Sequence, residues 1–348
     1  MKIQNIYLNI YQKKKVNVYW ITSNAEVEKK IKKKKFKCVS RKNVIKFIYL
    51  VFKTKLFIDA GFSNFFLNLR ANKDCQKILY LGHGEGIKFS KNLINIYGYD
   101  YYNFLSSFLI KKFFFNYNTI SEKKILRLGY PRIEFLLKNK KKINAKKKQF
   151  RYLLNNKKSI DSKKIVLYTP TWRNYNYDLP LLNLKGFNIK TFNQFLKIND
   201  IYFFYSLHLN NPPKKILTNH SNIFFINKNL KPLYDTTEFI GEIDILINDC
   251  STTTTEACLL KLPQVYIFPD YKIYKRRIGF SSIYKNEIPG PICKDFNTFI
   301  NLLRDYLIHK RIYFDEYNFK IKKYLKKYNN TSSVDSTKKI FNFIQNLN

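Results

Sequence analysis

A run of hydroxyl side chains in the second half of the chain has the residue types of an anion-binding site. The run reads NDCSTTTTEA at residues 248–257, after a short apolar segment and before a helix-compatible one. The sequence therefore predicts a strand-to-helix turn at Ser251, Thr252 and Thr253. A helix N-terminus exposes unpaired N–H groups and the positive end of the helix dipole, and hydroxyl groups there can donate hydrogen bonds to an anion.

Helix capping is the alternative use of the same residues. Ser251 and Thr252 are of the types that cap a helix N-terminus. Glu256 stands three residues after Thr253, which is the spacing of a capping box. The two uses are compatible with each other.

Three other segments place a chemically useful side chain just past an expected strand. LYLGHGEG holds His83 between two glycines, where a histidine can act as a general base near neutral pH. LYTPTWR ends in Arg173, which can hold a phosphate, and YSLHLNNP places His208 at a third strand end. The structural alternatives are a loop-bonded histidine, a surface salt bridge and a buried histidine. The convergence of all three on strand ends favours a site for phosphate binding or proton transfer.

Short apolar runs that alternate with segments of helix length predict α/β units. The expected buried strands are VNVYWI (16–21), KLFIDA (55–60), KILYLG (77–82), KIVLYTP (164–170), IYFFYSL (201–207), NIFFI (222–226), DILIND (244–249) and QVYIFP (264–269). This alternation in two blocks implies two parallel sheets. Ligands of open parallel sheets bind beyond the carboxyl ends of the strands, so the loops after the strands are the expected place for chemistry.

The length of the chain and a lysine-dense connector predict two domains. The 348 residues suit two domains of roughly 150 residues each. Residues 138–164 are the most lysine-dense part of the chain and are interpreted as a solvated connector with one short helix. We therefore expect an N-terminal domain at 1–155 and a C-terminal domain at 156–348, with C-terminal helices that can cross back.

The net charge points to an anionic partner. Lys and Arg number 64 against 24 Asp and Glu, for a formal charge of +40, and AT-rich coding is the alternative origin of this bias. No RNA-stacking, zinc-finger or helix-turn-helix signature is present, which argues against a nucleic-acid partner. The five cysteines include no CxxC pair, which argues against a zinc site or a disulfide framework and fits a reducing compartment. No run approaches the ~20 apolar residues of a membrane span.

Five stretches, in chain order, resemble the motifs of the CDP-glycerol glycerophosphotransferases, the teichoic acid primases and polymerases. These stretches are GHG (82–84), LGYPRIEFLL (128–137), VLYTPTWR (166–173), DILINDCSTTTTEA (244–257) and GF-x8-PGP (279–291). They are similar to the family's HGTP, GYPRND, APTWR, ADVLITDYSS and GFYFDYEE…PGP segments. The resemblance covers about residues 15–300 and implies two Rossmann-like α/β domains facing a cleft, the GT-B type.

The resemblance also implies an activity and a location. Members transfer glycerol phosphate from CDP-glycerol to a hydroxyl of a lipid-linked or polymeric acceptor and release CMP, in the cytoplasm on the inner membrane face. His83 would be the general base on the acceptor hydroxyl, and His208 would lie near the donor phosphates. The lysine-rich segment 29–37 and the segment 108–115, which mixes aromatic residues and lysines, are then candidate contacts with an anionic membrane surface; a core helix whose lysines extend to the surface is the alternative for 108–115.

The other site residues carried over from the resemblance belong to the donor. The expected donor phosphate and nucleotide site comprises Asp249, Ser251, Thr252, Thr253 and Glu256, with Arg173 as a further phosphate contact. Asp249 matches the acid that precedes the hydroxyl pair and would orient the loop. No acidic DxD cluster is present and no metal ligand is assigned, although Mg²⁺ bridging the pyrophosphate is compatible with the sequence.

Departures from the family motifs leave alternatives open. HGEG replaces HGTP, and SLHLNNP lacks the lysine usual in the family beside its histidine. A CDP-ribitol or other CDP-alditol donor therefore stays open. A GT-B nucleotide-sugar glycosyltransferase of capsule or lipopolysaccharide synthesis is the alternative activity, and an inactive scaffolding member is another.

Overall fold

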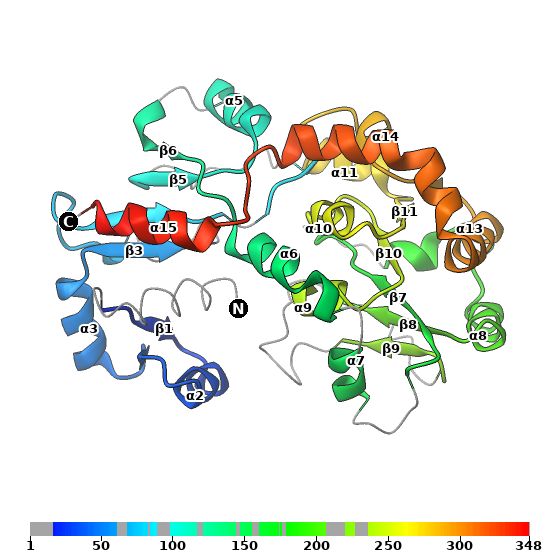
Figure 1. The fold of residues 1–348 in the computed structure, drawn as a ribbon, viewed down its shortest axis with the longest axis horizontal. Coiled ribbons are helices and arrows are strands. Elements are labelled where there is room, and N and C mark those ends of the chain that lie inside the picture. Colours follow the sequence, from blue (N-terminus) through cyan, green and yellow to red (C-terminus); the bar gives the residue numbers. More distant parts are fainter. Residues whose placement is uncertain are drawn as a thin grey trace. The chain divides into compact units, whose positions relative to one another are not determined.

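The computed structural model divides into two compact units, each with its own parallel sheet (Figure 1). The structure describes residues 17–60, 68–82, 84–88, 98–116, 121–143, 147–154, 160–173, 175, 179–206, 220–226 and 236–347. The first unit comprises Met1–His83, Asn92–Phe135 and Asn330–Asn348, and the second comprises Gly84–Lys91 and Leu136–Asn329. Helix α6 (Pro131–Ile143) contains residue 135, after which the chain passes from the first unit to the second. The C-terminal residues return to the first unit.

The first unit is built on short parallel strands. Its four-stranded sheet has the order β3 (Leu56–Asp59), β4 (Lys77–Tyr80), β5 (Tyr101–Asn103) and β6 (Ile125–Leu126), and β1 (Trp20–Thr22) pairs with β2 (Cys38–Ser40). The helices are α2 (Ala25–Lys33), α3 (Val44–Lys53), α5 (Ser107–Asn116), the start of α6 and α15 (Ser336–Gln345), with a 3₁₀ turn at Glu122–Lys124. All these strand pairs are parallel.

Strand β4 shows how the first unit forms its core. Successive side chains of a strand point to opposite faces of the sheet. Ile78 and Tyr80 pack in a cluster with Phe57 and Tyr102. Leu79 and Leu81 pack in a separate cluster with α15 residues Ile340, Phe341 and Ile344. The helix that ends the chain therefore covers one face of a sheet made near its beginning (Figure 1).

The second unit has one six-stranded parallel sheet. Its strand order is β12 (Ile292–Cys293), β11 (Gln264–Ile267), β10 (Ile245–Asn248), β7 (Lys164–Tyr168), β8 (Ile201–Tyr205) and β9 (Ile223–Phe225). The helices are α7 (Lys148–Leu153), α8 (Ile189–Ile198), α9 (Thr236–Ile240), α10 (Thr253–Leu260), α11 (Tyr271–Arg277), α12 (Tyr284–Glu287), α13 (Phe296–Ile308) and α14 (Lys310–Tyr328), with a 3₁₀ turn at Pro180–Asn183. The order reverses between β7 and β10, so the crevice of a doubly wound sheet is expected beyond the ends of these two strands.

The apolar runs predicted all strands of four or five residues and two of the shorter ones. Each of the eight expected segments overlaps a strand. β8 reads IYFFY and is buried throughout, as expected for a parallel strand covered on both faces. Strands β2, β5, β6 and β12 were not expected; each has only two or three residues, and none of them lies in one of the longer apolar runs that revealed the equally short β1 and β9.

Candidate functional site

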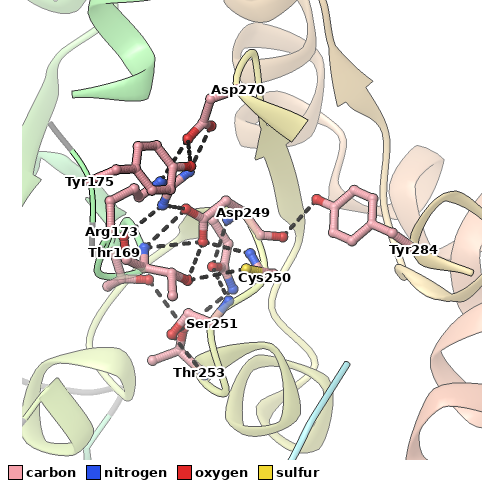
Figure 2. A network of polar contacts seen from close by, with 11 residues as sticks. Thr169, Arg173, Tyr175, Asp249, Cys250, Ser251, Thr253, Asp270 and Tyr284 are labelled. Carbon is pink, nitrogen blue, oxygen red and sulfur yellow. Dashed lines mark hydrogen bonds and ion pairs between the residues drawn. The ribbon is translucent and has the colours of Figure 1, made fainter. Parts of the chain in front are cut away.

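A polar network joins the loops that follow β7 and β10, at the point where the strand order reverses. Asp249 is the first residue after β10, and its carboxylate accepts hydrogen bonds from the Thr171 N–H at 3.1 and 3.0 Å. The Thr171 hydroxyl donates to the same carboxylate. Tyr284 donates from its hydroxyl to the Asp249 backbone oxygen at 2.7 Å. The Asp249 carboxylate therefore joins the loops at two strand ends (Figure 2).

Arg173 lies between two buried carboxylates. Its Nε and Nη2 donate to Asp270 at 3.0 and 2.9 Å, and Nη1 forms an ion pair with Asp249. Nη1 also donates to the Thr171 backbone oxygen at 2.6 Å. Figure 2 shows the guanidinium between the two acids, with Tyr175 donating to Asp270 beside it. The guanidinium uses four of its five N–H donors in these bonds, and Arg173 is only 3% exposed, so little of it is open to a phosphate.

Burial and the charges of this cluster shift the pKa values of its side chains. Burial disfavours the cation at Arg173, but Asp249 and Asp270 outweigh that effect and raise its pKa. Burial, assisted by the charge of Asp249, raises the pKa of the Cys250 thiol to about 12. Burial and the bond to Asp270 raise the pKa of Tyr175. The thiol and the phenol are therefore neutral at physiological pH, and the charged groups of the cluster are the arginine and its carboxylates.

The hydroxyl run divides into an accessible part and a buried part. Ser251 and Thr252 are half-buried, whereas Thr253, Thr254, Thr255 and Glu256 are buried. Helix α10 begins at Thr253, so the expected turn between strand and helix is confirmed. Ser251 and Thr252 are thus the members of the run that can reach a ligand.

The expected capping box does not form. Thr252 holds the cap position and Thr253 is the first helical residue, so Glu256 is the fourth helical residue rather than the third, which a capping box requires. Thr252, at the cap position, has helical backbone angles (φ −64°, ψ −14°) and makes no side-chain capping bond. Ser251 serves instead, because its Oγ accepts a bond from the Thr253 N–H at 3.4 Å.

Two glycines shape the segment that precedes and follows His83. Gly82 has φ +103°, and a Cβ there would lie 2.1 Å from the Tyr130 ring. A Cβ on Gly86 would lie 2.8 Å from the Tyr324 hydroxyl oxygen. Between them the Glu85 backbone oxygen accepts a bond from the Thr255 hydroxyl at 3.1 Å, which fastens this segment to α10. Both glycines are therefore required by close packing.

The expected site residues fall into two groups. Asp249, Arg173, Ser251, Thr252, Thr253 and Glu256 all belong to the second unit and lie on or beside the loops after β7 and β10. His83 and His208 lie outside the described residues. The sequence did not indicate three further residues of the network: Thr171, Asn248 and Asp270. Each of them lies at or just past the end of a strand, which is where ligands of parallel sheets bind.

A metal site has no support among the residues that the structure describes. In this part of the chain no group of three or more His, Cys, Asp or Glu side chains could hold an ion. The hydroxyl groups and the N-terminus of α10 are instead the donor set available to an anion.

Comparisons with known proteins identify similar sequences. The family model for CDP-glycerol:poly(glycerophosphate) glycerophosphotransferase matches residues 2–346. The teichoic acid glycerol-phosphate primase of Bacillus subtilis (strain 168) is 26% identical over 327 residues, which are 88% of this chain and 77% of that protein. The teichoic acid glycerol-phosphate transferase of Staphylococcus aureus is 25% identical over 53% of this chain and 46% of its own length.

Comparison with solved structures confirms the fold class. The wall teichoic acid polymerase TagF superposes with a TM-score of 0.77 at 19% identity, covering 99% of this chain and 85% of that one. A UDP-GlcNAc 2-epimerase from Neisseria meningitidis superposes with a TM-score of 0.59 at 14% identity, covering 99% and 96%. The α/β class with two Rossmann-like units of the GT-B type is thus as the sequence predicted.

Proposed function

Because the chain belongs to the CDP-glycerol:poly(glycerophosphate) glycerophosphotransferase family, it is a transferase, and we propose that it moves glycerol phosphate from CDP-glycerol to a hydroxyl of a lipid-linked or polymeric cell-wall acceptor. CMP is the product that leaves. In this proposal the second unit holds the donor, and the first unit serves the acceptor and the membrane.

The observation that carries the proposal is the placement of Ser251 and Thr252. They are the accessible hydroxyl residues of the run, they directly precede α10, and they follow β10 at the reversal of strand order. Ligands of doubly wound sheets bind at this point, and a helix N-terminus stabilises a phosphate there. The donor pyrophosphate is therefore assigned to Ser251, Thr252 and the first turn of α10.

The chemistry follows from that position. The acceptor hydroxyl attacks the β-phosphorus of CDP-glycerol in line, and the bond from that phosphorus to the bridging oxygen breaks. His83 is the proposed base that takes the hydroxyl proton. The charge that develops on the departing CMP is stabilised by the donors at Ser251 and Thr252. His208 is proposed near the same phosphates. The ion pair between Arg173 and Asp249 holds the loop that carries Ser251 and Thr252.

Donor turnover tests the proposal. Purified protein is given CDP-glycerol, CDP-ribitol, UDP-sugars and CMP-sugars with a lipid-linked acceptor and anionic vesicles, and nucleotide release is measured. Release of CMP from CDP-glycerol is expected. The Ser251→Ala/Thr252→Ala variant should raise the donor KM or lower kcat, because it removes both accessible hydroxyls. Thr191→Ala is the matched control, since Thr191 is an exposed hydroxyl in the first turn of α8.

The same assay decides between this activity and the alternative. Turnover of a nucleotide sugar, with no CMP release from either CDP-alditol, would replace the phosphotransferase by a glycosyltransferase on the same fold. Turnover of CDP-ribitol in preference to CDP-glycerol would keep the reaction and change the alditol.

A peripheral membrane location is part of the proposal, and helix α3 supports it. None of the described helices is long and apolar enough to cross a membrane. Helix α3 nevertheless carries five exposed apolar side chains at helical spacing, with Ile45 85% and Phe52 67% exposed: Val44, Ile45, Ile48, Tyr49 and Phe52. Its other face packs inward through Leu50 and Val51.

The exposed lysines on α3 and in segment 29–37 favour contact with an anionic membrane surface. Lys46 and Lys53 on α3 are exposed, and so are Lys29 and most of the other lysines in the predicted segment 29–37. Each lysine near an anionic bilayer contributes about 1 kcal/mol. In the predicted segment 108–115, Lys111 and Lys112 are exposed, and the side chains from 113 on lie outside the described part.

Vesicle co-sedimentation tests this location. Ile45→Ser/Phe52→Ser should lower the binding to phosphatidylglycerol vesicles by at least about tenfold, since burying one such side chain is worth ~1.5–3 kcal/mol. Ile198→Ser/Phe319→Ser is the matched control, because these side chains are 74% and 77% exposed elsewhere on the chain. Equal loss in both variants, or no loss in either, would remove α3 from the membrane contact.

A further inference from the structure

Asn248, the last residue of β10, has a side-chain amide whose orientation is determined by its neighbours. Its Oδ1 accepts bonds from the Asp249 N–H at 2.7 Å and the Ser251 N–H at 3.2 Å. Both partners are donors, so this end of the amide must be the oxygen. Its Nδ2 therefore faces Thr253 and Thr254, and it donates to their hydroxyl oxygens at 3.3 and 2.8 Å. Asn248 is 0% exposed, so water does not compete for these bonds.

Because the amide presents a donor to Thr253, it occupies one lone pair of that hydroxyl and does not take up its proton. Thr253 Oγ1 accepts from Asn248 and lies 3.1 Å from both Thr169 Oγ1 and Ser251 Oγ. A hydroxyl has one proton and two lone pairs. Thr253 donates its proton to Ser251, so Thr169 is the donor in the remaining bond. Figure 2 shows Thr169, Thr253 and Ser251 in contact along this line.

The series of bonds ends at the accessible Ser251. Its Oγ accepts from the Thr253 hydroxyl at 3.1 Å and from the Thr253 N–H at 3.4 Å. Both lone pairs are then occupied, and the Ser251 proton is left pointing away from Thr253. Ser251 can consequently donate to a ligand oxygen but cannot accept from a ligand donor, which is the property that an anion requires.

We propose that Asn248 is a positioning residue that, through Thr253, makes the Ser251 hydroxyl an obligatory hydrogen-bond donor to a phosphate oxygen. This inference rests on the proposed function for the identity of the nucleotide, but it concerns any phosphate bound at Ser251. Asn248 acts as a neutral amide in this role, and it does not contact the ligand.

The test is a set of matched variants read by two assays. Thr253→Val keeps the shape of the buried side chain and removes the donor to Ser251. Asn248→Asp keeps the shape of the amide but turns the donor that faces Thr253 into an acceptor. Thr237→Val is the control for losing a buried threonine hydroxyl, because Thr237 is 1% exposed and lies on α9. The assays are CDP affinity by titration calorimetry and the KM and kcat for CDP-glycerol.

Thr253→Val and Asn248→Asp should each weaken CDP binding by about 10- to 100-fold, the value of a hydrogen bond to a charged group. The donor KM should rise more than kcat falls, and Thr237→Val should bind CDP like the wild type. In a Ser251→Ala background, Thr253→Val should have no further effect, because it acts through Ser251. A purely structural role would instead give additive losses in the double variant.

Each result decides the proposal. Additive losses, or wild-type CDP affinity in Thr253→Val, would overturn it. If the wild type binds CDP but does not turn over CDP-glycerol, the proposed function fails. The role of Asn248 and Thr253 in orienting Ser251 is still judged on CDP affinity. If the wild type binds neither CDP nor CDP-glycerol, no phosphate binds at Ser251 and the proposed role of Asn248 is rejected. The melting temperature of each variant identifies loss of fold.

Discussion

Replacing Arg173 by leucine should destabilise the second unit strongly. The change removes four hydrogen bonds and leaves Asp249 and Asp270 without their cation. The side chains of both acids are 0% exposed, so water cannot replace the guanidinium. Breaking a buried ion pair by removing one partner costs about 3–5 kcal/mol.

The structure places the expected loss near the lower end of that range. Asp249 keeps the bonds from the N–H and the hydroxyl of Thr171, and Asp270 keeps the bond from the Tyr175 hydroxyl. We therefore expect Arg173→Leu to lower the free energy of unfolding by about 3 kcal/mol. Arg173→Lys should lose less, because it keeps the charge but not the two-pronged contact with Asp270.

Urea unfolding measures this loss. The chain has two tryptophans, so Trp172 fluorescence in a Trp20→Phe background reports on the second unit. Arg311→Leu is the control, because Arg311 pairs with Asp315 at the surface, where both side chains are largely exposed and a change should stay within about 0.5 kcal/mol.

A second variant separates buried charge from lost packing. Arg173→Leu/Asp249→Asn/Asp270→Asn removes all three charges together, and it should be more stable than the single variant because no unpaired carboxylate remains. A loss below about 1 kcal/mol in Arg173→Leu, or a triple variant that is less stable than the single one, would refute the electrostatic reasoning.

Three further predictions address other parts of the chain. His83→Ala should lower kcat for CMP release by at least about a hundredfold if His83 is the base, and a near-wild-type rate would remove that role. Gly86→Ala should lower the melting temperature, since its Cβ would lie 2.8 Å from the Tyr324 hydroxyl oxygen, and Tyr324→Phe in the same background should restore part of the loss. At pH 8 Ellman's reagent should modify the exposed Cys75 rapidly and Cys250 only after unfolding, because burial raises the pKa of Cys250 to about 12 and keeps it a thiol; equal rates would show that the site opens in the native state.

Part of the site could be predicted because its signal is local. The hydroxyl run follows an apolar strand within a few residues, so the turn at Ser251 and Thr252 is visible in the sequence. The helix begins at Thr253, one residue earlier than a capping box with Thr253 as the cap would require, and the Ser251 hydroxyl accepts the Thr253 N–H. A spacing rule cannot choose between neighbouring hydroxyls that have the same chemistry.

The partners of these residues were not predictable from the same signal. Arg173 was expected to bind phosphate, but nothing near it in the chain indicates that its guanidinium bonds to Asp270, 97 residues away. Asn248 and Thr171 lie within the matched motifs, but the sequence does not indicate that Thr171 bonds to Asp249 across the reversal of strand order or that the Asn248 amide bonds to Thr253.

The sequence by itself determined the fold class, the longer strands and the family. Apolar runs and motifs are formed by residues close together in the chain, and their order can be followed along it. Only the tertiary structure decided which side chains meet at the site. Parallel order brings the ends of β7 and β10 together although 76 residues separate Arg173 from Asp249. Burial then makes those contacts obligatory, because charged and polar groups without water must satisfy one another.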